Sequence, residues 1–162
     1  MRGSDAIVAV ASISATTLGC GATTAARTAP VPVPAQAAPA ASKLVSLGLM
    51  YESGRGVARD EARASALYKQ ACDAGDAHGC GNLGFMVETG RGVDRDEARA
   101  ASLYKQACGG GDAHGCGNLG VMVEGGKGIA ADHASGVRLL RQGCRAGDTF
   151  GCQQLEHLGE AP

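Results

Sequence analysis

Aromatic residues are scarce in this sequence, and tryptophan is absent. Phe, Trp and Tyr together make up 3% of the 162 residues, too few for the stacking platforms that bind single-stranded nucleic acids. Charge is nearly balanced, with 15 Lys and Arg against 16 Asp and Glu. The sequence therefore lacks the basic excess that is typical of nucleic-acid-binding proteins, and we expect no nucleic-acid partner.

A membrane-spanning hydrophobic run is also missing. Residues 6–19 are mostly small and apolar, but this stretch is too short to cross a bilayer. Together with Arg2 it is typical of a signal peptide, which we place at residues 1–20. The segment ends in T-L-G-C, which is similar to a bacterial lipobox except that threonine stands where leucine is preferred. We expect a lipid on Cys20. Plain cleavage between residues 22 and 29 is the alternative.

The next segment, residues 21–41, contains four of the five prolines among many alanines and threonines. Such a composition cannot bury a core and favours a semi-extended spacer. We interpret it as a tether between a membrane and the rest of the chain, with the lipid as the sole membrane contact; a disordered tail left by cleavage is the alternative. The expected location is the periplasm, the outer membrane as a lipoprotein, or the extracellular space.

From residue 41 the sequence repeats itself every 36 residues. The full copies are 41–76, 77–112 and 113–148, and a partial copy that would form a closing helix occupies 149–162. A fixed period of roughly 20–50 residues is the signature of a solenoid, in which each repeat packs on its neighbours.

Each copy contains two helical patterns, shown here for the second copy. The first helix is predicted at 77–89, and Gly90 is expected to end it because glycine adopts the positive φ of a helix C-cap at little cost. The second begins near Asp96, a favourable N-cap residue. Both have an apolar stripe at helical spacing: Cys80, Leu83, Gly84 and Val87 in the first, and Ala100, Leu103, Tyr104, Ala107 and Cys108 in the second. The predicted fold class is all-α, an α/α solenoid of stacked helix-turn-helix units.

These units resemble Sel1-like repeats, which are related to tetratricopeptide repeats. The similarity rests on L-G-x-M-x-E-x-G-x-G-V followed by D-E-A-R-A-x-x-L-Y-K-Q-A-C within residues 83–108, and it extends over about 41–162. The family often has tryptophan where this chain has Leu67, Leu103 and Leu139. The cysteines are similar to those of a cysteine-rich subgroup whose members are often labelled beta-lactamases or penicillin-binding proteins. That resemblance implies a beta-lactam or a cell-wall fragment as a ligand.

Six of the seven cysteines follow the same period. In each pair the first cysteine lies in the last turn of one repeat, and the second, eight residues later, lies in the first turn of the next. A tight turn between these positions brings them within bonding distance. The first copy has Leu44 at this position, where no preceding helix could supply a partner. Because an exported chain folds in oxidising surroundings, we predict three disulfides: Cys72–Cys80, Cys108–Cys116 and Cys144–Cys152.

A metal site is the competing interpretation of these cysteines. His78 and His114 lie beside the first two pairs, so each of those junctions offers three ligands. A structural zinc site needs four ligands, and the third junction has Phe150 in place of the histidine. We therefore expect neither a metal nor another cofactor.

The beta-lactamase label calls for a search for catalytic residues. A serine enzyme of that class needs S-x-x-K, S-D-N and K-T-G elements. The sequence has one S-x-x-K, from Ser102 to Lys105, and neither of the other two elements. Ser102 lies away from the apolar stripe of its helix and is expected to face solvent. No nucleophile–base pair can be identified, so the hypothesis of an enzyme rests on resemblance alone.

A binding surface has more support in the sequence. First helices of stacked repeats line the concave face, and side chains off their buried stripes recur in rows. Asparagine amides in a row can donate to and accept from an extended peptide backbone; local turn capping or exposure to water is the alternative. The candidate peptide-binding residues are His78, Asn82, Phe85, His114, Asn118 and Val121.

Acidic residues near the ends of the first helices have a simpler interpretation. Glu52, Glu88 and Glu124 recur at the repeat period. We expect them to pair with Arg91 or Lys127 in the adjoining loops.

The leading hypothesis for function is an exported repeat scaffold that binds a protein or peptide in the cell envelope. The alternative, a protein that binds or hydrolyses beta-lactams, follows from the family resemblance alone. A spacer without a specific ligand is a third possibility.

Overall fold

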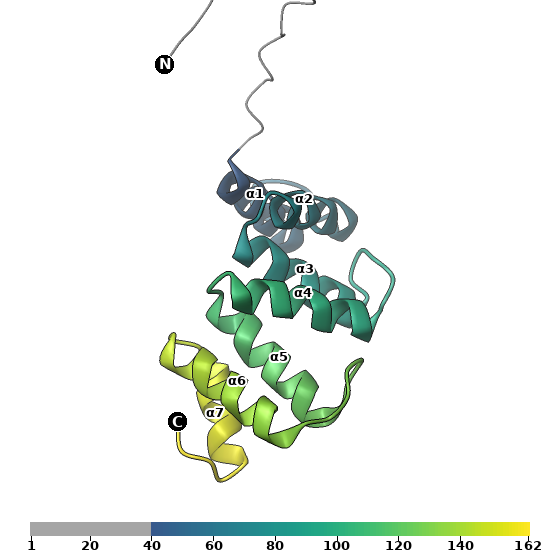
Figure 1. Ribbon diagram of the computed structural model, residues 1–162. Helices are drawn as coiled ribbons and strands as arrows, with labels where there is room; N and C mark the ends of the chain where they lie inside the picture. The colour runs from purple at the N-terminus through teal and green to yellow at the C-terminus, as the bar shows by residue number, and fades with distance from the viewer. Residues whose placement is uncertain (1–39) are drawn as a thin grey trace, which may run out of the picture. The chain divides into compact units, whose positions relative to one another are not determined.

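The computed structural model describes residues 40–162. The predicted signal peptide, Cys20 and all but the end of the proline-rich segment lie outside these residues. Within them the chain forms seven helices and no strand (Figure 1). The helices are α1 (Ala41–Ser53), α2 (Glu61–Asp73), α3 (Ala77–Thr89), α4 (Glu97–Gly109), α5 (Ala113–Gly125), α6 (His133–Arg145) and α7 (Thr149–His157).

Aspartate starts every helix except α1. At α4, for example, Asp96 is extended and its side chain accepts a hydrogen bond from the backbone N–H of Arg99. This bond satisfies one of the amides that a helix N-terminus leaves without a partner. The odd-numbered helices α1, α3 and α5 end at a left-handed glycine, Gly54, Gly90 and Gly126. The predicted helix boundaries follow from these local signals.

Consecutive helices pack as antiparallel pairs, and the pairs stack on one another. The pairs α1/α2, α3/α4 and α5/α6 are formed by the three full repeats, and α7 covers the last of them (Figure 1). The odd-numbered helices also contact each other in sequence, α1 with α3, α3 with α5, and α5 with α7. This arrangement confirms the predicted all-α solenoid of stacked helix pairs.

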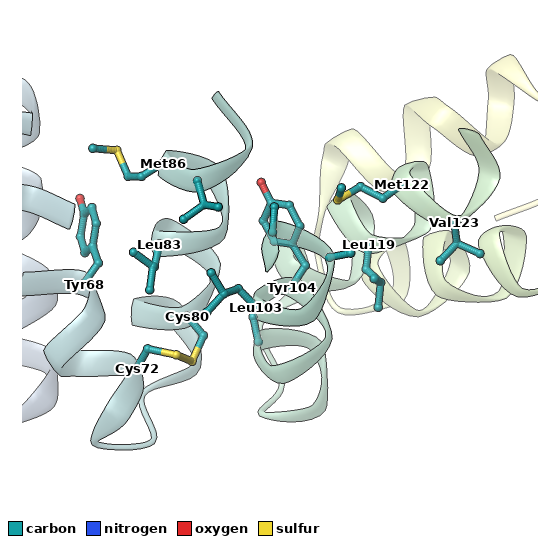
Figure 2. Packing of buried hydrophobic residues seen from close by; sticks show 14 of the residues in the cluster. Tyr68, Cys72, Cys80, Leu83, Met86, Leu103, Tyr104, Leu119, Met122 and Val123 are labelled. Atoms are coloured by element: carbon teal, nitrogen blue, oxygen red, sulfur yellow. A yellow bond between two sulfur atoms is a disulfide. The ribbon is translucent and has the colours of Figure 1, made fainter. Parts of the chain in front are cut away.

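Glycine on the first helix of each pair makes room for a large side chain of the second. A Cβ at Gly84 would lie 2.9 Å from the ring of Tyr104, which is fully buried. Gly48 has the same relation to Tyr68, whereas Leu140 replaces the tyrosine opposite Gly120. Figure 2 shows both tyrosines within the hydrophobic core. Glycine weakens a helix by about 0.5–1 kcal/mol relative to alanine. Packing between helices must therefore supply the stability that α3 and α5 lack by themselves.

Each tyrosine hydroxyl also binds the carboxylate at the end of the preceding helix. Tyr68 donates to Glu52 over 2.7 Å, and Tyr104 donates to Glu88 over 2.8 Å. Burial raises the pKa of both phenols, and the acceptor carboxylate raises it further. The hydroxyl therefore remains protonated and able to donate.

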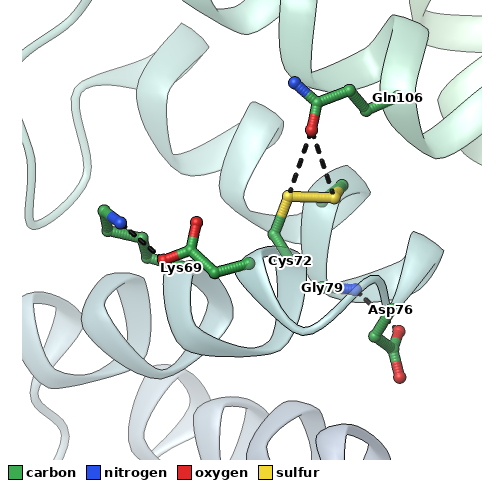
Figure 3. Close-up of a disulfide and its surroundings, with 7 residues drawn as sticks. Lys69, Cys72, Asp76, Gly79 and Gln106 are labelled. Carbon is green, nitrogen blue, oxygen red and sulfur yellow. Dashed lines mark hydrogen bonds and ion pairs between the residues drawn. A yellow bond between two sulfur atoms is a disulfide. The ribbon is translucent and has the colours of Figure 1, made fainter. Parts of the chain in front are cut away.

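Three disulfides join successive repeats. They are Cys72–Cys80, Cys108–Cys116 and Cys144–Cys152, with Cα separations of 4.5, 4.5 and 4.7 Å. Each connects the last turn of an even-numbered helix to the first turn of the next odd-numbered helix. At the first bond, the Gln106 amide oxygen lies 3.7 Å from the Cys72 sulfur and 3.9 Å from the Cys80 sulfur (Figure 3). A side chain from α4, in the same repeat as Cys80, thus covers this disulfide.

The loop between the helices of one repeat packs on the preceding repeat. Gly92, with φ +65°, lies against the first backbone atoms of α2, and Gly128 lies in the same way against α4. Ser65 donates a hydrogen bond of 3.2 Å to the carbonyl oxygen of Gly92. These loops form a second connection between repeats, separate from the disulfides.

Candidate functional site

A groove with a volume of about 530 Å³ lies along the odd-numbered helices. Three of them contribute, so the groove extends over all three full repeats. Its lining residues are Ser42, Val45 and Leu49 of α1; Asp76 with His78, Gly81, Asn82 and Phe85 of α3; and Asp112 with His114 and Asn118 of α5.

The repeat period explains this lining. On each odd-numbered helix the contributing residues are spaced by about one and two turns, so that they share a face. His78, Asn82 and Phe85 form this stripe on α3, and the equivalent positions of α1 are Ser42, Ser46 and Leu49, of which Ser42 and Leu49 line the groove. Because the odd-numbered helices lie next to one another, the stripes form rows across the groove.

Five of the six predicted peptide-binding residues line this groove. The exception is Val121, which is partly buried against a second apolar cluster formed by Val137, Leu140 and Leu155. Its position on α5 corresponds to that of Phe85 on α3, which is 41% exposed. The difference arises because the cluster formed by α6 and α7 covers Val121, whereas no comparable cluster of residues 40–162 covers Phe85.

The two asparagines lie at the centre of the groove lining. Asn82 and Asn118 are half-buried. Neither caps a helix, because Asp76 and Asp112 accept the N-terminal amide bonds of α3 and α5. Within residues 40–162 neither side-chain amide takes part in a hydrogen bond, so both have donors and acceptors available to a ligand.

Each groove histidine contacts the aspartate that caps the next odd-numbered helix. His78 Nδ1 lies 3.2 Å from Asp112 Oδ1, and His114 Nδ1 lies 2.8 Å from Asp148 Oδ1. Both imidazoles remain largely exposed, at 73% and 72%, whereas the two carboxylates are buried. The pairs therefore fix the orientation of the histidine rings at the rim of the groove.

Phe85 is held at its edge of the groove by a cation. The Arg91 guanidinium lies 5.6 Å from the centre of the Phe85 ring. Arg91 also forms ion pairs of 3.0 Å with Glu52 and with Glu61. Hydrogen bonds from Arg59 and then Arg91 lower the pKa of Glu61. Arg91 thus connects its own repeat to both helices of the preceding one.

Two of the predicted glutamate pairs are wrong, and one needs refinement. Glu88 accepts a bond from Tyr104 rather than from Arg91, because Arg91 reaches back to the preceding repeat. Glu124 binds His133 at 2.8 Å rather than Lys127, and this hydrogen bond raises the pKa of His133. Glu52 does pair with Arg91, but across a repeat junction rather than within its own loop.

The S-x-x-K sequence lies away from the groove. Ser102 and Lys105 are exposed on α4, and the groove is formed by odd-numbered helices. Within the described residues no side-chain hydrogen bond involves Ser102.

A search of residues 40–162 finds no group of three or more His, Cys, Asp or Glu side chains placed to hold a metal ion. In the same part of the chain, none of the helices combines the length and the apolar character needed to span a bilayer.

The fold and the groove define a class: an α-helical repeat scaffold, linked by disulfides, that presents a row of side chains from its first helices. A family model described as Sel1 repeat matches residues 44–76, 77–112 and 113–148. The chain therefore belongs to the Sel1 repeat family, as its sequence motifs predicted. A search of curated proteins found no match.

Solved structures with the same fold include three bacterial proteins. Cysteine-rich protein B of Helicobacter pylori is 29% identical, with a TM-score of 0.60 over 71% of this chain and 89% of that one. A protective antigen of uropathogenic Escherichia coli strains, described as displaying an SLR fold, is 29% identical, with a TM-score of 0.69. A Sel1 repeat protein from Oxalobacter formigenes is 22% identical, also with a TM-score of 0.69, and shows the fold alone.

The last two proteins are much longer than the part that matches. Each alignment covers 73% of this chain, but only 25% of the Escherichia coli antigen and 47% of the Oxalobacter protein.

Proposed function

We propose that this protein binds an extended peptide segment of another protein in the groove along α1, α3 and α5. A Sel1 repeat scaffold is suited to protein interaction, and the groove supplies a specific place for it. The observation that supports a peptide most strongly is the pair of equivalent amides, Asn82 and Asn118, that line the groove without partners in the described chain. A row of such amides matches the regular donors and acceptors of an extended backbone.

Apolar contacts complete this proposal. Leu49 and Phe85 are 49% and 41% exposed, although both are large and hydrophobic. Both line the groove beside the asparagines. An extended peptide can therefore place alternate side chains on them while its backbone binds the amides.

Removal of both amides is expected to weaken peptide binding at least tenfold. Asn82→Ala combined with Asn118→Ala leaves ligand backbone groups unpaired, at a cost of about 1–3 kcal/mol for each buried group, and about 1.4 kcal/mol corresponds to tenfold. Binding is measured by fluorescence anisotropy with pools of capped hexapeptides and the full chain. Circular dichroism and the melting temperature should stay unchanged.

The matched control is Ser102→Ala combined with Lys105→Ala, two truncations on the exposed face of α4. This variant should bind the same pools as the wild type does. Normal binding by the asparagine variant together with weak binding by the α4 variant would show that the groove is not the binding site.

We further propose that the protein functions outside the cytoplasm, attached through a lipid on Cys20. Three disulfides indicate an oxidising environment, and the apolar segment ending in T-L-G-C supports export with lipid attachment. The mature protein is expected to begin at Cys20, which N-terminal mapping by mass spectrometry can check. It is also expected to partition into the detergent phase on phase separation. A soluble mature protein that begins beyond residue 21 would contradict the lipid anchor.

A further inference from the structure

Three aspartates occupy the same position at the start of α3, α5 and α7. Asp76, Asp112 and Asp148 each accept a hydrogen bond from a backbone N–H of their own helix. Two of them also have a histidine partner from the preceding odd-numbered helix, as described above. Asp76 has no ion-pair partner within residues 40–162, because the residue at the histidine position of α1 is Ser42.

Asp76 also differs from the other two aspartates in its burial. Asp112 and Asp148 are 4% and 0% exposed, whereas Asp76 is half-buried. The cause is a second difference in α1. A Cβ at Gly81 would collide with the Asp112 carboxylate, so the glycine makes the space in which that carboxylate lies.

Gly117 has the same relation to Asp148. The equivalent residue of α1 is Val45, which has a side chain where α3 and α5 have glycine. Two departures from the repeat, Ser42 and Val45, therefore leave the Asp76 carboxylate at the surface of the groove.

Within residues 40–162 the Asp76 carboxylate forms no ion pair with a lysine or arginine. Its Oδ1 accepts the Gly79 N–H at 3.0 Å, and its Oδ2 accepts no hydrogen bond from residues 40–162. No lysine or arginine is among the residues that line the groove. The same lining includes Val45, Leu49 and Phe85, so a free carboxylate lies in the same groove as an apolar surface.

We propose that the groove selects a peptide with a basic side chain that pairs with Asp76, next to an apolar side chain that packs on Val45, Leu49 and Phe85. This proposal rests on the peptide-binding function proposed above and defines its ligand. The two internal pairs provide the precedent, because His78 and His114 place a nitrogen donor on the equivalent carboxylates. The basic side chain of the ligand thus supplies to Asp76 the nitrogen donor that a histidine supplies to Asp112 and Asp148.

The test compares pools of capped hexapeptides that fix either arginine or citrulline, its neutral analogue, and uses the full-length protein. The wild type is expected to prefer arginine about fivefold, the ratio given by about 1 kcal/mol for a partly exposed ion pair. Asp76→Asn should abolish this preference. Asparagine is as good an N-cap as aspartate, so α3 should remain capped.

The matched control is Asp94→Asn, which changes the net charge equally at an exposed position that does not line the groove. This variant should keep the preference for arginine. A double variant, Ser42→His with Val45→Gly, copies the other repeats and should reduce the preference by giving Asp76 an internal partner. This double variant tests the role of Asp76 independently if Asp76→Asn changes the melting temperature.

The outcomes separate this proposal from the one on which it rests. Equal binding of arginine and citrulline pools by the wild type would overturn the charge selection and leave peptide binding intact. Retention of the preference by Asp76→Asn would also overturn it. If no pool binds at all, the peptide-binding function itself fails, and the charge selection fails with it.

Discussion

Reduction of the three disulfides is expected to unfold the described chain at temperatures where the oxidised protein is stable. Each bond closes a loop of about nine residues, which is worth about 2.6 kcal/mol in the chain-entropy model. The three together amount to about 8 kcal/mol, which is comparable to the total stability of about 5–15 kcal/mol that is usual for a domain. The helices that begin at these bonds are intrinsically weak, since α3 contains Gly79, Gly81 and Gly84.

The measurement is thermal unfolding followed by circular dichroism, with and without a reductant. Removal of one pair, by Cys108→Ala with Cys116→Ala, should lower the melting temperature by about 10 °C, because about 1 kcal/mol shifts it by several degrees in a domain of this size. Full reduction should lower it much further. A reduced protein that melts within a few degrees of the oxidised one would show that packing alone holds the repeats together.

Peptide mapping under non-reducing conditions provides the control for that experiment. It should recover the three junction pairs and no free thiol within residues 42–162. A linkage between Cys80 and Cys108 would contradict the arrangement in which each bond joins adjacent helix ends.

The architecture was predictable because its determinants are local and repeated. Asp96 at a helix start and Gly90 at a helix end act within a few residues, so the sequence alone locates the boundaries of α3 and α4. The 36-residue period then places the same signals in every copy. Leu44 also indicated where the disulfide series begins, because it stands where the next two copies have Cys80 and Cys116.

Contacts between repeats were harder to predict because they join residues far apart in the sequence. Arg91 binds Glu52 and Glu61, which lie 39 and 30 residues away. The sequence suggested the nearer Glu88 instead, but the phenol of Tyr104 occupies that carboxylate. Charge and spacing identify possible partners, whereas the packing of one repeat on the next selects among them.

In the candidate site, too, some features followed from the repeat period and others depend on packing between helices. The rows of histidine and asparagine followed from the period. Val121 does not line the groove, because it packs against an apolar cluster formed by α6 and α7. The proposed role of Asp76 depends on Val45, which stands where α3 and α5 have the glycines that make room for Asp112 and Asp148. A signal was present in the sequence: α1 lacks both the histidine and the glycine that α3 and α5 share.

Replacement of Gly92 by alanine is expected to destabilise the protein by about 4 kcal/mol or more, at the upper end of single substitutions. A Cβ at this position would overlap the backbone of Glu61 and Ala62, which cannot move aside as a flexible side chain can. The loop would therefore have to leave α2, and the hydrogen bond from Ser65 to the Gly92 carbonyl would be lost. Chemical denaturation monitored by circular dichroism measures the change in the free energy of unfolding.

Gly56→Ala is the matched control, because Gly56 occupies the same position in the first repeat. Its φ of +77° is also left-handed, so alanine there carries the same conformational cost of about 1–2 kcal/mol. The difference is contact: a Cβ at Gly56 would meet only the Met50 side chain, at 3.6 Å, among residues 40–162. The two variants thus share the backbone strain and differ in the loop-to-helix contact. If they are equally destabilised, strain explains the whole effect and the loop contributes nothing to repeat stacking. A Gly92→Ala loss at least twice that of Gly56→Ala would assign the excess to the junction.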